Sequence, residues 1–258
     1  MIPRIIHYCW FGEKPLSELA QKCIESWKIY CPEYQIIRWD ETNFNIDYCA
    51  YTKEAFDNKK WAFITDVVRL YVLYMYGGIY MDTDVEVIKS IDSILGYQCV
   101  SGFESETAVP TGLIASEKAN PFIKKLLDEY DEIHFIRDDG SLDMTTNVKR
   151  ITKACVSAGL VLNNTMQTVN GFTILPKDYL CPKNCVTKEL QITDNTMTIH
   201  HFDGSWHTDE EKFIFETYGK LKQKYTNNVA HKIAIFKGYM KFRGILGTIK
   251  GLFDLKVK

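Results

Sequence analysis

The 258-residue sequence contains no apolar run that reaches the roughly 18 residues of a membrane-spanning helix. Its first 15 residues also contain too short an apolar run for a secretory signal. Lys and Arg number 31 against 33 Asp and Glu, so the formal net charge is -2 and the positive excess typical of nucleic-acid-binding proteins is missing. We therefore expect a cytoplasmic protein with no nucleic-acid partner.

The eight cysteines do not form the spacing of a disulfide framework, because most of them lie inside apolar patterns. Cys181 and Cys185 form the one suggestive pair, but no second half with finger-like Cys or His spacing is visible, which favours plain thiols over a zinc site. Internal repeats and low-complexity linkers are also missing. With 46% hydrophobic residues, the chain can bury the core of one moderate or two small domains.

Residues 61–87 combine a helix, a glycine stop and a strand that ends in two carboxylates. Asp66 and Arg69 are three residues apart and so are neighbours on one side of the predicted helix. Gly77 and Gly78 end this helix, since glycine reaches left-handed backbone angles at little steric cost. Apolar residues at helical spacing predict one stripe for burial against a sheet: Trp61, Ile64, Val68, Tyr71, Val72 and Met75.

The predicted strand after the glycines places its side chains on alternating faces. Ile79 and Met81 point into a core, while Tyr80, Asp82 and Asp84 share the other face. In an extended strand the two aspartates lie about 6 to 7 Å apart along the backbone, close enough to converge on one cation. We expect Mg²⁺ or Mn²⁺, because hard cations take carboxylate oxygens together with substrate phosphates.

Strand and helix patterns alternate along the rest of the chain, which predicts an α/β domain with its ligand site outside the carboxyl ends of the strands. Trp10 stands at such an end, where an indole either stacks on a base or simply packs. We expect strands near residues 4–10, 34–39, 98–103, 112–116, 172–175 and 196–200, and helices near residues 17–30, 120–130 and 147–158.

A pair of histidines follows the last of these strands. Adjacent side chains on a strand face opposite ways, so at most one of His200 and His201 can enter a given pocket. A neutral imidazole at a strand end can complete the coordination of a cation, and it can equally serve ordinary packing.

Taken together, IPRIIHYCWFG, the D-x-x-R of Asp66 and Arg69, GGIYMDTD and the late HHFDGSW resemble a known family. They are similar to the DXD-containing glycosyltransferases grouped around yeast α-1,6-mannosyltransferase and bacterial capsular polysaccharide enzymes, over residues 1–207 and most strongly over 62–88. The resemblance implies a GT-A fold with a Rossmann-like mixed sheet flanked by helices. It also implies a nucleotide-sugar donor, a divalent metal and net retention of anomeric configuration.

The resemblance also implies roles for single residues. His201, rather than His200, matches the third metal ligand because it stands three residues before Gly204. The segment 145–147 departs from the turn expected there and leaves the acceptor side open. The other matches are Asp82 and Asp84 to the metal and diphosphate, Asp66 and Arg69 to the donor sugar, Trp10 and Tyr80 to the nucleotide, and Ser205 and Trp206 to a segment that closes over the diphosphate.

We therefore expect a metal-dependent retaining glycosyltransferase that uses Mn²⁺ or Mg²⁺. It would move a hexose, from UDP-galactose or UDP-glucose in preference to GDP-mannose, to a glycan or lipid-linked oligosaccharide acceptor in capsular or surface polysaccharide synthesis. Two alternatives remain open. One is a haloacid-dehalogenase-like phosphatase that uses Asp82 and Asp84, for which the required second acidic pair would have to be Asp138 and Asp139 in a loop. The other is a non-catalytic nucleotide-sugar-binding protein.

We divide the chain into a catalytic domain of residues 1–210 and a basic amphipathic helical extension of residues 211–258. Basic residues alternate with large apolar ones in this extension, a pattern that fits a helix lying on an anionic membrane surface. A helical pair that packs on the catalytic domain is the alternative. The first interpretation predicts a peripheral protein on the inner face of the cell membrane.

Overall fold

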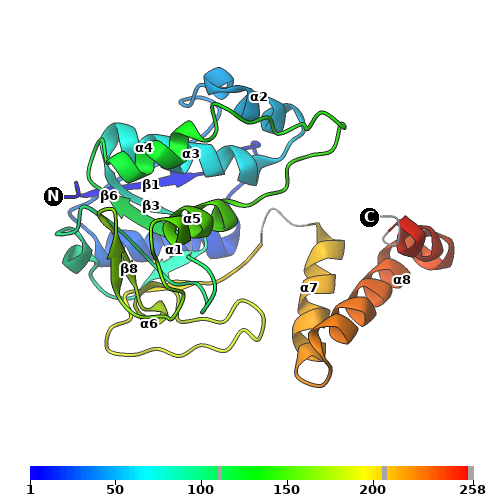
Figure 1. Ribbon diagram of the computed structural model, residues 1–258. Helices are drawn as coiled ribbons and strands as arrows, with labels where there is room; N and C mark the ends of the chain where they lie inside the picture. The colour runs from blue at the N-terminus through cyan, green and yellow to red at the C-terminus, as the bar shows by residue number, and fades with distance from the viewer. Residues whose placement is uncertain (110–111, 205–207, 255–258) are drawn as a thin grey trace. The chain divides into compact units, whose positions relative to one another are not determined.

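The structure is a computed structural model that describes residues 1–109, 112–204 and 208–254. Figure 1 shows strands at the centre of the first part of the chain, with helices packed on them, and two helices at the end. Most predicted elements are present with ends shifted by one or two residues, whereas α2, α6, β4 and β7 were not predicted. The elements before residue 202 are β1 (Ile5–Cys9), α1 (Glu18–Tyr30), β2 (Gln35–Trp39), η1 (Ile46–Tyr48), α2 (Ala50–Asp57), α3 (Trp61–Tyr76), β3 (Gly78–Met81), β4 (Val85–Val87), η2 (Asp92–Ile94), β5 (Cys99–Gly102), β6 (Leu113–Ser116), α4 (Pro121–Asp128), α5 (Asn147–Ser157), β7 (Gln167–Val169), β8 (Phe172–Leu175), α6 (Lys177–Leu180) and β9 (Thr198–His200).

The chain divides into two compact units. The first unit contains residues 1–183 and 190–201, and the second contains residues 184–189 and 202–258. The predicted division into a catalytic domain and an extension at residue 210 stays a prediction.

Seven strands of the first unit form one mixed sheet in the order β2-β1-β3-β6-β5-β8-β7. β1 runs parallel to β2 and β3, and β5 runs parallel to β8, whereas β6 is antiparallel to both β3 and β5. The expected α/β architecture, a mixed sheet flanked by helices, is confirmed. A separate two-stranded sheet pairs β4 with β9.

Side chains of the large sheet alternate between two buried cores. Tyr80 belongs to the core that also contains residues of α3, α4 and α5, whereas Ile79 and Met81 belong to the core that contains Trp27 of α1. The predicted alternation along β3 is therefore correct as far as Met81. All eight cysteines are free thiols, as expected, and six of them are buried.

Helix α3 is buried on more sides than its apolar stripe predicted. It packs against α2, against α4, which lies beside it in Figure 1, and against the sheet. Asp66 and Arg69 are consequently only 8% and 5% exposed. Met75 was assigned to the buried stripe, but it is 39% exposed because the last turn of α3 is at the solvent-exposed end of the helix.

The turn from α3 into β3 requires glycine at Gly77, as predicted from the sequence. Gly77 has φ 68° and ψ -171°, a region that side-chain-bearing residues rarely adopt. His7 of β1 secures this turn. Because the Trp39 indole can only donate, His7 Nδ1 accepts its hydrogen bond (3.1 Å), and Nε2–H donates to the Gly77 carbonyl (2.9 Å). Burial lowers the pKa of His7 to about 4, so the ring stays neutral at pH 7.

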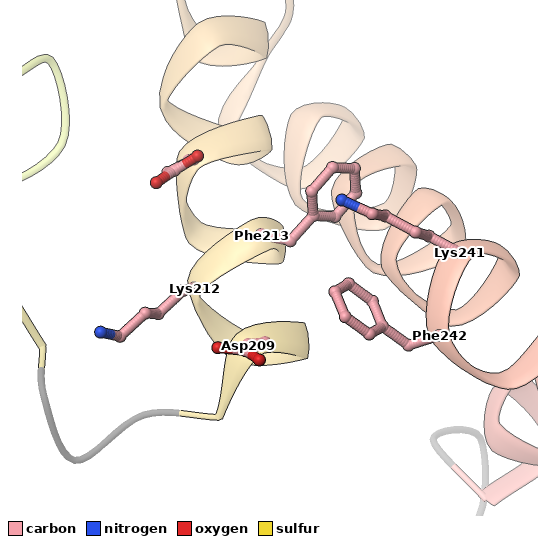
Figure 2. Close-up of a pocket in the computed structure, with 6 residues that line it drawn as sticks. Asp209, Lys212, Phe213, Lys241 and Phe242 are labelled. Carbon is pink, nitrogen blue, oxygen red and sulfur yellow. The ribbon is translucent and has the colours of Figure 1, made fainter.

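The second unit is a pair of helices, α7 (Asp209–Lys222) and α8 (Asn227–Asp254). Thr208 and Glu211 form a capping box at the start of α7. Figure 2 shows Phe213 of α7 facing Lys241 and Phe242 of α8, with Lys241 Nζ 4.1 Å from the Phe213 ring centroid. These side chains line a cavity of about 400 Å³.

Helix α8 is interrupted at Gly244, where φ is 68°. Of the helices that the structure describes, none combines the length and the apolar character that crossing a membrane requires.

Candidate functional site

Five strands of the large sheet have their carboxyl ends on the same side of the sheet. β1 is parallel to β2 and β3, β6 is antiparallel to both β3 and β5, and β5 is parallel to β8, so β1, β2, β3, β5 and β8 all point the same way. Residues that follow their carboxyl ends include Trp10, Asp82, Glu104 and Lys177. This edge is where ligands bind in open α/β sheets, and it is the candidate functional site.

The two aspartates after β3 lie on a turn and not on an extended strand. β3 ends at Met81, and the Val85 N–H donates to the Asp82 carbonyl (3.0 Å), which closes the turn. The predicted continuation of the strand through Asp84 is therefore wrong. The chain has to bend here because β4 leaves the large sheet and pairs with β9. The turn, and not strand alternation, brings the Asp82 and Asp84 carboxylates together.

His200 completes a three-residue cluster with these aspartates. One ligand atom from each of Asp82, Asp84 and His200 lies within 4.8 Å of the other two, and His200 Nε2 is 3.3 Å from Asp84 Oδ1. Two carboxylates and an imidazole are a donor set for a divalent cation, with phosphate oxygens of a substrate as further ligands. The residues present therefore fit the predicted metal.

His201, the predicted third ligand, is directed elsewhere. Its Nε2 lies 2.7 Å from Oε2 of Glu86, a residue that also pairs with Lys22. The antiparallel register of β4 and β9 sets Val85 opposite His200 and Glu86 opposite Ile199. Because adjacent strand residues face opposite ways, only one of the two histidines can face the aspartates. In the structure this residue is His200, which corrects the prediction.

The charges of the cluster shift the pKa values of its members. Burial disfavours the charged form of His200, but the neighbouring Asp84 carboxylate holds its pKa well above 6.5. The pKa of Asp82 is raised, chiefly by burial. The charge of Arg69 opposes this shift, and the charge of Asp84 adds to it. A cation bound here would therefore displace a proton and relieve the repulsion between the two carboxylates.

Arg69 links the helix to the cluster. Its Nη2 lies 3.2 Å from Asp82 Oδ1 and 3.4 Å from Asp66 Oδ1. The guanidinium carbon also stands 4.6 Å from the centroid of the Tyr80 ring. Asp66 and Arg69 are thus part of a buried network that orients Asp82. The three-residue spacing alone would predict only an exposed salt bridge within the helix.

Asp66 faces helix α5 as well as Arg69. Its Oδ2 accepts the Asn147 backbone N–H (3.1 Å), and the Asn147 side-chain amide donates to the Asp66 carbonyl (3.1 Å). Thr146 stands at the N-cap of α5 but makes no capping hydrogen bond with its side chain, so Asp66 supplies this acceptor instead. Burial raises the pKa of Asp66 to about 6 although Arg69 lowers it. The departure from the family pattern at residues 145–147 therefore lies directly against Asp66.

Other predicted residues differ in their placement. Trp10 is partly exposed after β1 and donates from its indole to the Lys14 carbonyl (2.6 Å). Tyr80 is 1% exposed, and its hydroxyl donates to Asp82 Oδ1 (3.0 Å), so it supports the cluster from below. It does not offer a ring face to a nucleotide, because Arg69 covers it. Ser205 and Trp206 lie outside the described residues.

Two residues at the site were not predicted from the sequence. Glu104 follows β5 at the same edge of the sheet. Its pKa is raised, chiefly by burial; the charge of His200 opposes this shift, and the charge of Asp82 adds to it. Gly112, which precedes β6, accepts the Asp82 backbone N–H (2.8 Å) through its carbonyl. Glu104 could have been predicted as a site residue, because it is an acidic residue that follows an apolar strand. No local sequence pattern distinguishes Gly112.

Comparisons with known proteins agree with the position of this site. Residues 17–101 match the family model described as glycosyltransferase sugar-binding region containing DXD motif, which confirms the predicted resemblance for this part of the chain. The segment includes Asp66, Arg69, Asp82 and Asp84.

Curated relatives include two fungal proteins. The chain is 27% identical over 137 residues to inositol phosphoceramide mannosyltransferase 3 of Schizosaccharomyces pombe, covering 49% of this chain and 36% of that protein. It is 28% identical over 146 residues to mannosyl phosphorylinositol ceramide synthase SUR1 of Saccharomyces cerevisiae, covering 53% and 37%. The chain thus spans little more than a third of the length of these relatives.

Similar solved structures include two glycosyltransferases. The PaToxG glycosyltransferase has 23% sequence identity and a TM-score of 0.48, with 60% of this chain and 68% of that chain covered. The galactosyltransferase LgtC has 15% identity and a TM-score of 0.44, with 89% and 95% covered.

Proposed function

We propose that this chain is a metal-dependent glycosyltransferase that moves a hexose from a nucleotide-sugar donor to a glycan or lipid-linked acceptor. The observation that carries the proposal is the cluster of Asp82, Asp84 and His200, with ligand atoms within 4.8 Å of one another at the carboxyl edge of the sheet. The family match over residues 17–101 includes both aspartates of this cluster.

The cluster suits this chemistry because a departing nucleoside diphosphate gains negative charge. A Mn²⁺ or Mg²⁺ ion held by these side chains would stabilise that charge as a Lewis acid. The protein's own part is to hold the ligands in place: Arg69 and the Tyr80 hydroxyl both contact Asp82 Oδ1. Fixed ligands need little reorganisation when charge develops, which is the general advantage of a preorganised site.

The donor and the acceptor are finer parts of the proposal. UDP-galactose and UDP-glucose are the donors expected from the sequence. GDP-mannose is a third candidate donor, because a relative is named as a mannosyltransferase. Two relatives are named for inositol phosphoceramide or its mannosylated product, which supports an acceptor that carries a lipid. Retention of configuration and a role in capsular or surface polysaccharide synthesis follow from the resemblance alone.

A membrane-bound acceptor would be reached most easily from the membrane surface. In the second unit, α8 exposes Phe242, Ile245, Leu246 and Ile249, which we call the α8 apolar patch. Exposed Lys237 and Lys241 lie close to it in the sequence. Large apolar side chains beside lysines favour binding to an anionic bilayer, and we propose that the protein is cytoplasmic and binds the inner face of the cell membrane in this way.

The metal site can be tested with variants of the two neighbouring histidines. Thermal unfolding of the full chain is measured with UDP-galactose, UDP-glucose and GDP-mannose, each with and without Mn²⁺, together with donor hydrolysis. Ligand binding raises apparent stability by mass action, so one donor should give a metal-dependent shift. Asp84→Asn and His200→Ala should abolish the shift and lower turnover about 100-fold or more.

His201→Ala is the matched control, because His201 pairs with Glu86 and should leave the shift and the turnover unchanged. The absence of a metal-dependent shift with every donor would refute the proposed function. Metal-dependent binding of a donor without any turnover, with glycan and lipid-linked acceptors supplied, would favour the non-catalytic binder instead.

A further inference from the structure

Gly112 lies between two members of the metal cluster. It is buried directly before β6, and its carbonyl accepts the Asp82 backbone N–H (2.8 Å), one position beyond the pairing of Met81 with Leu113. The backbone of Gly112 therefore sets where Asp82 leaves the sheet.

The other contact of Gly112 is with the His200 ring. A Cβ atom added at Gly112 would lie 2.8 Å from Nδ1, 3.0 Å from Cε1 and 3.3 Å from Cγ of His200. Real Cβ atoms essentially never come within 3.0 Å of another heavy atom, so the contact with Nδ1 shows that the ring occupies space that a side chain at position 112 would need. Gly112 does not have a positive φ. The close approach of the His200 ring, and not the backbone conformation, therefore requires glycine at this position.

His200 has little freedom to move away. The His200 side chain is only 14% exposed, and its Nε2 lies 3.3 Å from Asp84 Oδ1. A displaced ring would lose this contact and change its distance to the aspartates.

We propose that Gly112 is a positioning residue of the metal site: the ring of His200 rests against its Cα, its carbonyl holds the Asp82 backbone, and the spacing between the two ligands depends on it. The proposal rests on the proposed function, because it assumes that Asp82, Asp84 and His200 bind a divalent cation.

The test is the affinity of the full chain for Mn²⁺ alone, measured by titration with electron paramagnetic resonance of the free ion. Substitutions that disturb the orientation of metal ligands typically cost 10- to 100-fold in affinity, and we expect a loss of this size for Gly112→Ala. Gly96→Ala is the matched control, since nothing lies within 4 Å of the added Cβ and φ is not positive. It should bind Mn²⁺ like the wild type.

A double variant separates loss of positioning from a general loss of structure. If Gly112 acts through His200, then Gly112→Ala should add no further loss in a His200→Ala background, because the ring that it displaces is gone. Should Gly112→Ala alone fail to fold, recovery of folding in the double variant would support the same contact. Failure of both to fold, or an additive loss of affinity, would overturn the proposal.

The outcomes also separate this inference from the proposed function. Wild-type protein that binds Mn²⁺, together with Gly112→Ala protein of equal affinity, would overturn the inference and leave the proposed function intact. Wild-type protein that binds neither Mn²⁺ nor Mg²⁺, with or without nucleotide sugar, would overturn both.

Discussion

At the scale of single residues, Arg69 shows how burial changes the meaning of a short motif. An exposed ion pair between residues three apart on a helix usually stabilises the helix by only a few tenths of a kcal/mol. Here the Arg69 side chain is 6% exposed and lies between the carboxylates of Asp66 and Asp82, over the ring of Tyr80. Removing the arginine would leave buried carboxylates without their counter-charge.

We predict that Arg69→Ala lowers the free energy of unfolding by about 3 kcal/mol at pH 7.5, because breaking a buried ion pair strands its partner. The loss should depend on pH. The pKa of Asp66 is raised to about 6 from 3.8, so the penalty for ionising it is complete above about pH 6 and disappears as the pH falls to 3.8. Without Arg69 this pKa rises further.

The expected loss on Arg69→Ala is therefore smaller at pH 5 than at pH 7.5, measured by urea unfolding. Lys53→Ala removes the exposed pair of Lys53 with Asp57 on α2 and serves as the control with little change at either pH. A loss in Arg69→Ala that does not vary with pH would contradict the role given to Asp66.

At the scale of elements, the connection from α3 to β3 determines where the aspartates lie. Gly77 has φ 68°, and a Cβ there would come within 2.6 Å of the Lys118 backbone nitrogen. His7 holds the Gly77 carbonyl from β1. The chain can enter β3 and reach Asp82 only through this turn, so its geometry is transmitted to the site.

We predict that Gly77→Ala lowers the free energy of unfolding by about 2 kcal/mol or more, since strain in a glycine-only region and a clash with backbone add together. Gly140→Ala is the comparison without a clash: Gly140 also has positive φ (78°), but nothing lies within 4 Å of its added Cβ. This control should cost only about 1 kcal/mol, the penalty of left-handed backbone. Equal losses in the two variants, measured by urea unfolding, would exclude a contribution from the clash.

The segment between α3 and α4 also shows which elements were predictable. Gly77 and Gly78 marked the end of α3, and Asn120 with Pro121 marked the start of α4, because caps and first-turn residues act within a few positions of the chain. β4 was not separated from β3 in the prediction. Its three residues form a strand only because β9, more than a hundred residues later, pairs with them.

At the scale of the whole molecule, the second unit presents the α8 apolar patch, in which Leu246 is 85% and Ile245 66% exposed. Exposed clusters of large apolar side chains usually mark interaction surfaces. The nearby lysines favour an anionic partner.

We predict that the full chain sediments with vesicles of phosphatidylcholine containing anionic phosphatidylglycerol, and much less with phosphatidylcholine alone. The double change Ile245→Glu and Leu246→Glu should reduce binding at least tenfold, because it replaces apolar side chains by charges that the bilayer repels. Val161→Glu changes an exposed apolar residue of the first unit (59% exposed) and is the control. Equal sedimentation of the double variant and the wild type would refute the membrane surface.

The sequence alone was enough to predict the features that depend on neighbouring residues: the helix of residues 61–76, its glycine stop and the alternation through Met81. These follow from spacing and backbone angles over a few positions. The tertiary structure alone decided that His200 and not His201 faces the aspartates, that Tyr80 lies beneath Asp82, and that Asp66 holds the start of α5. Each of these depends on strand register or helix packing between segments far apart in the chain, which no local pattern encodes.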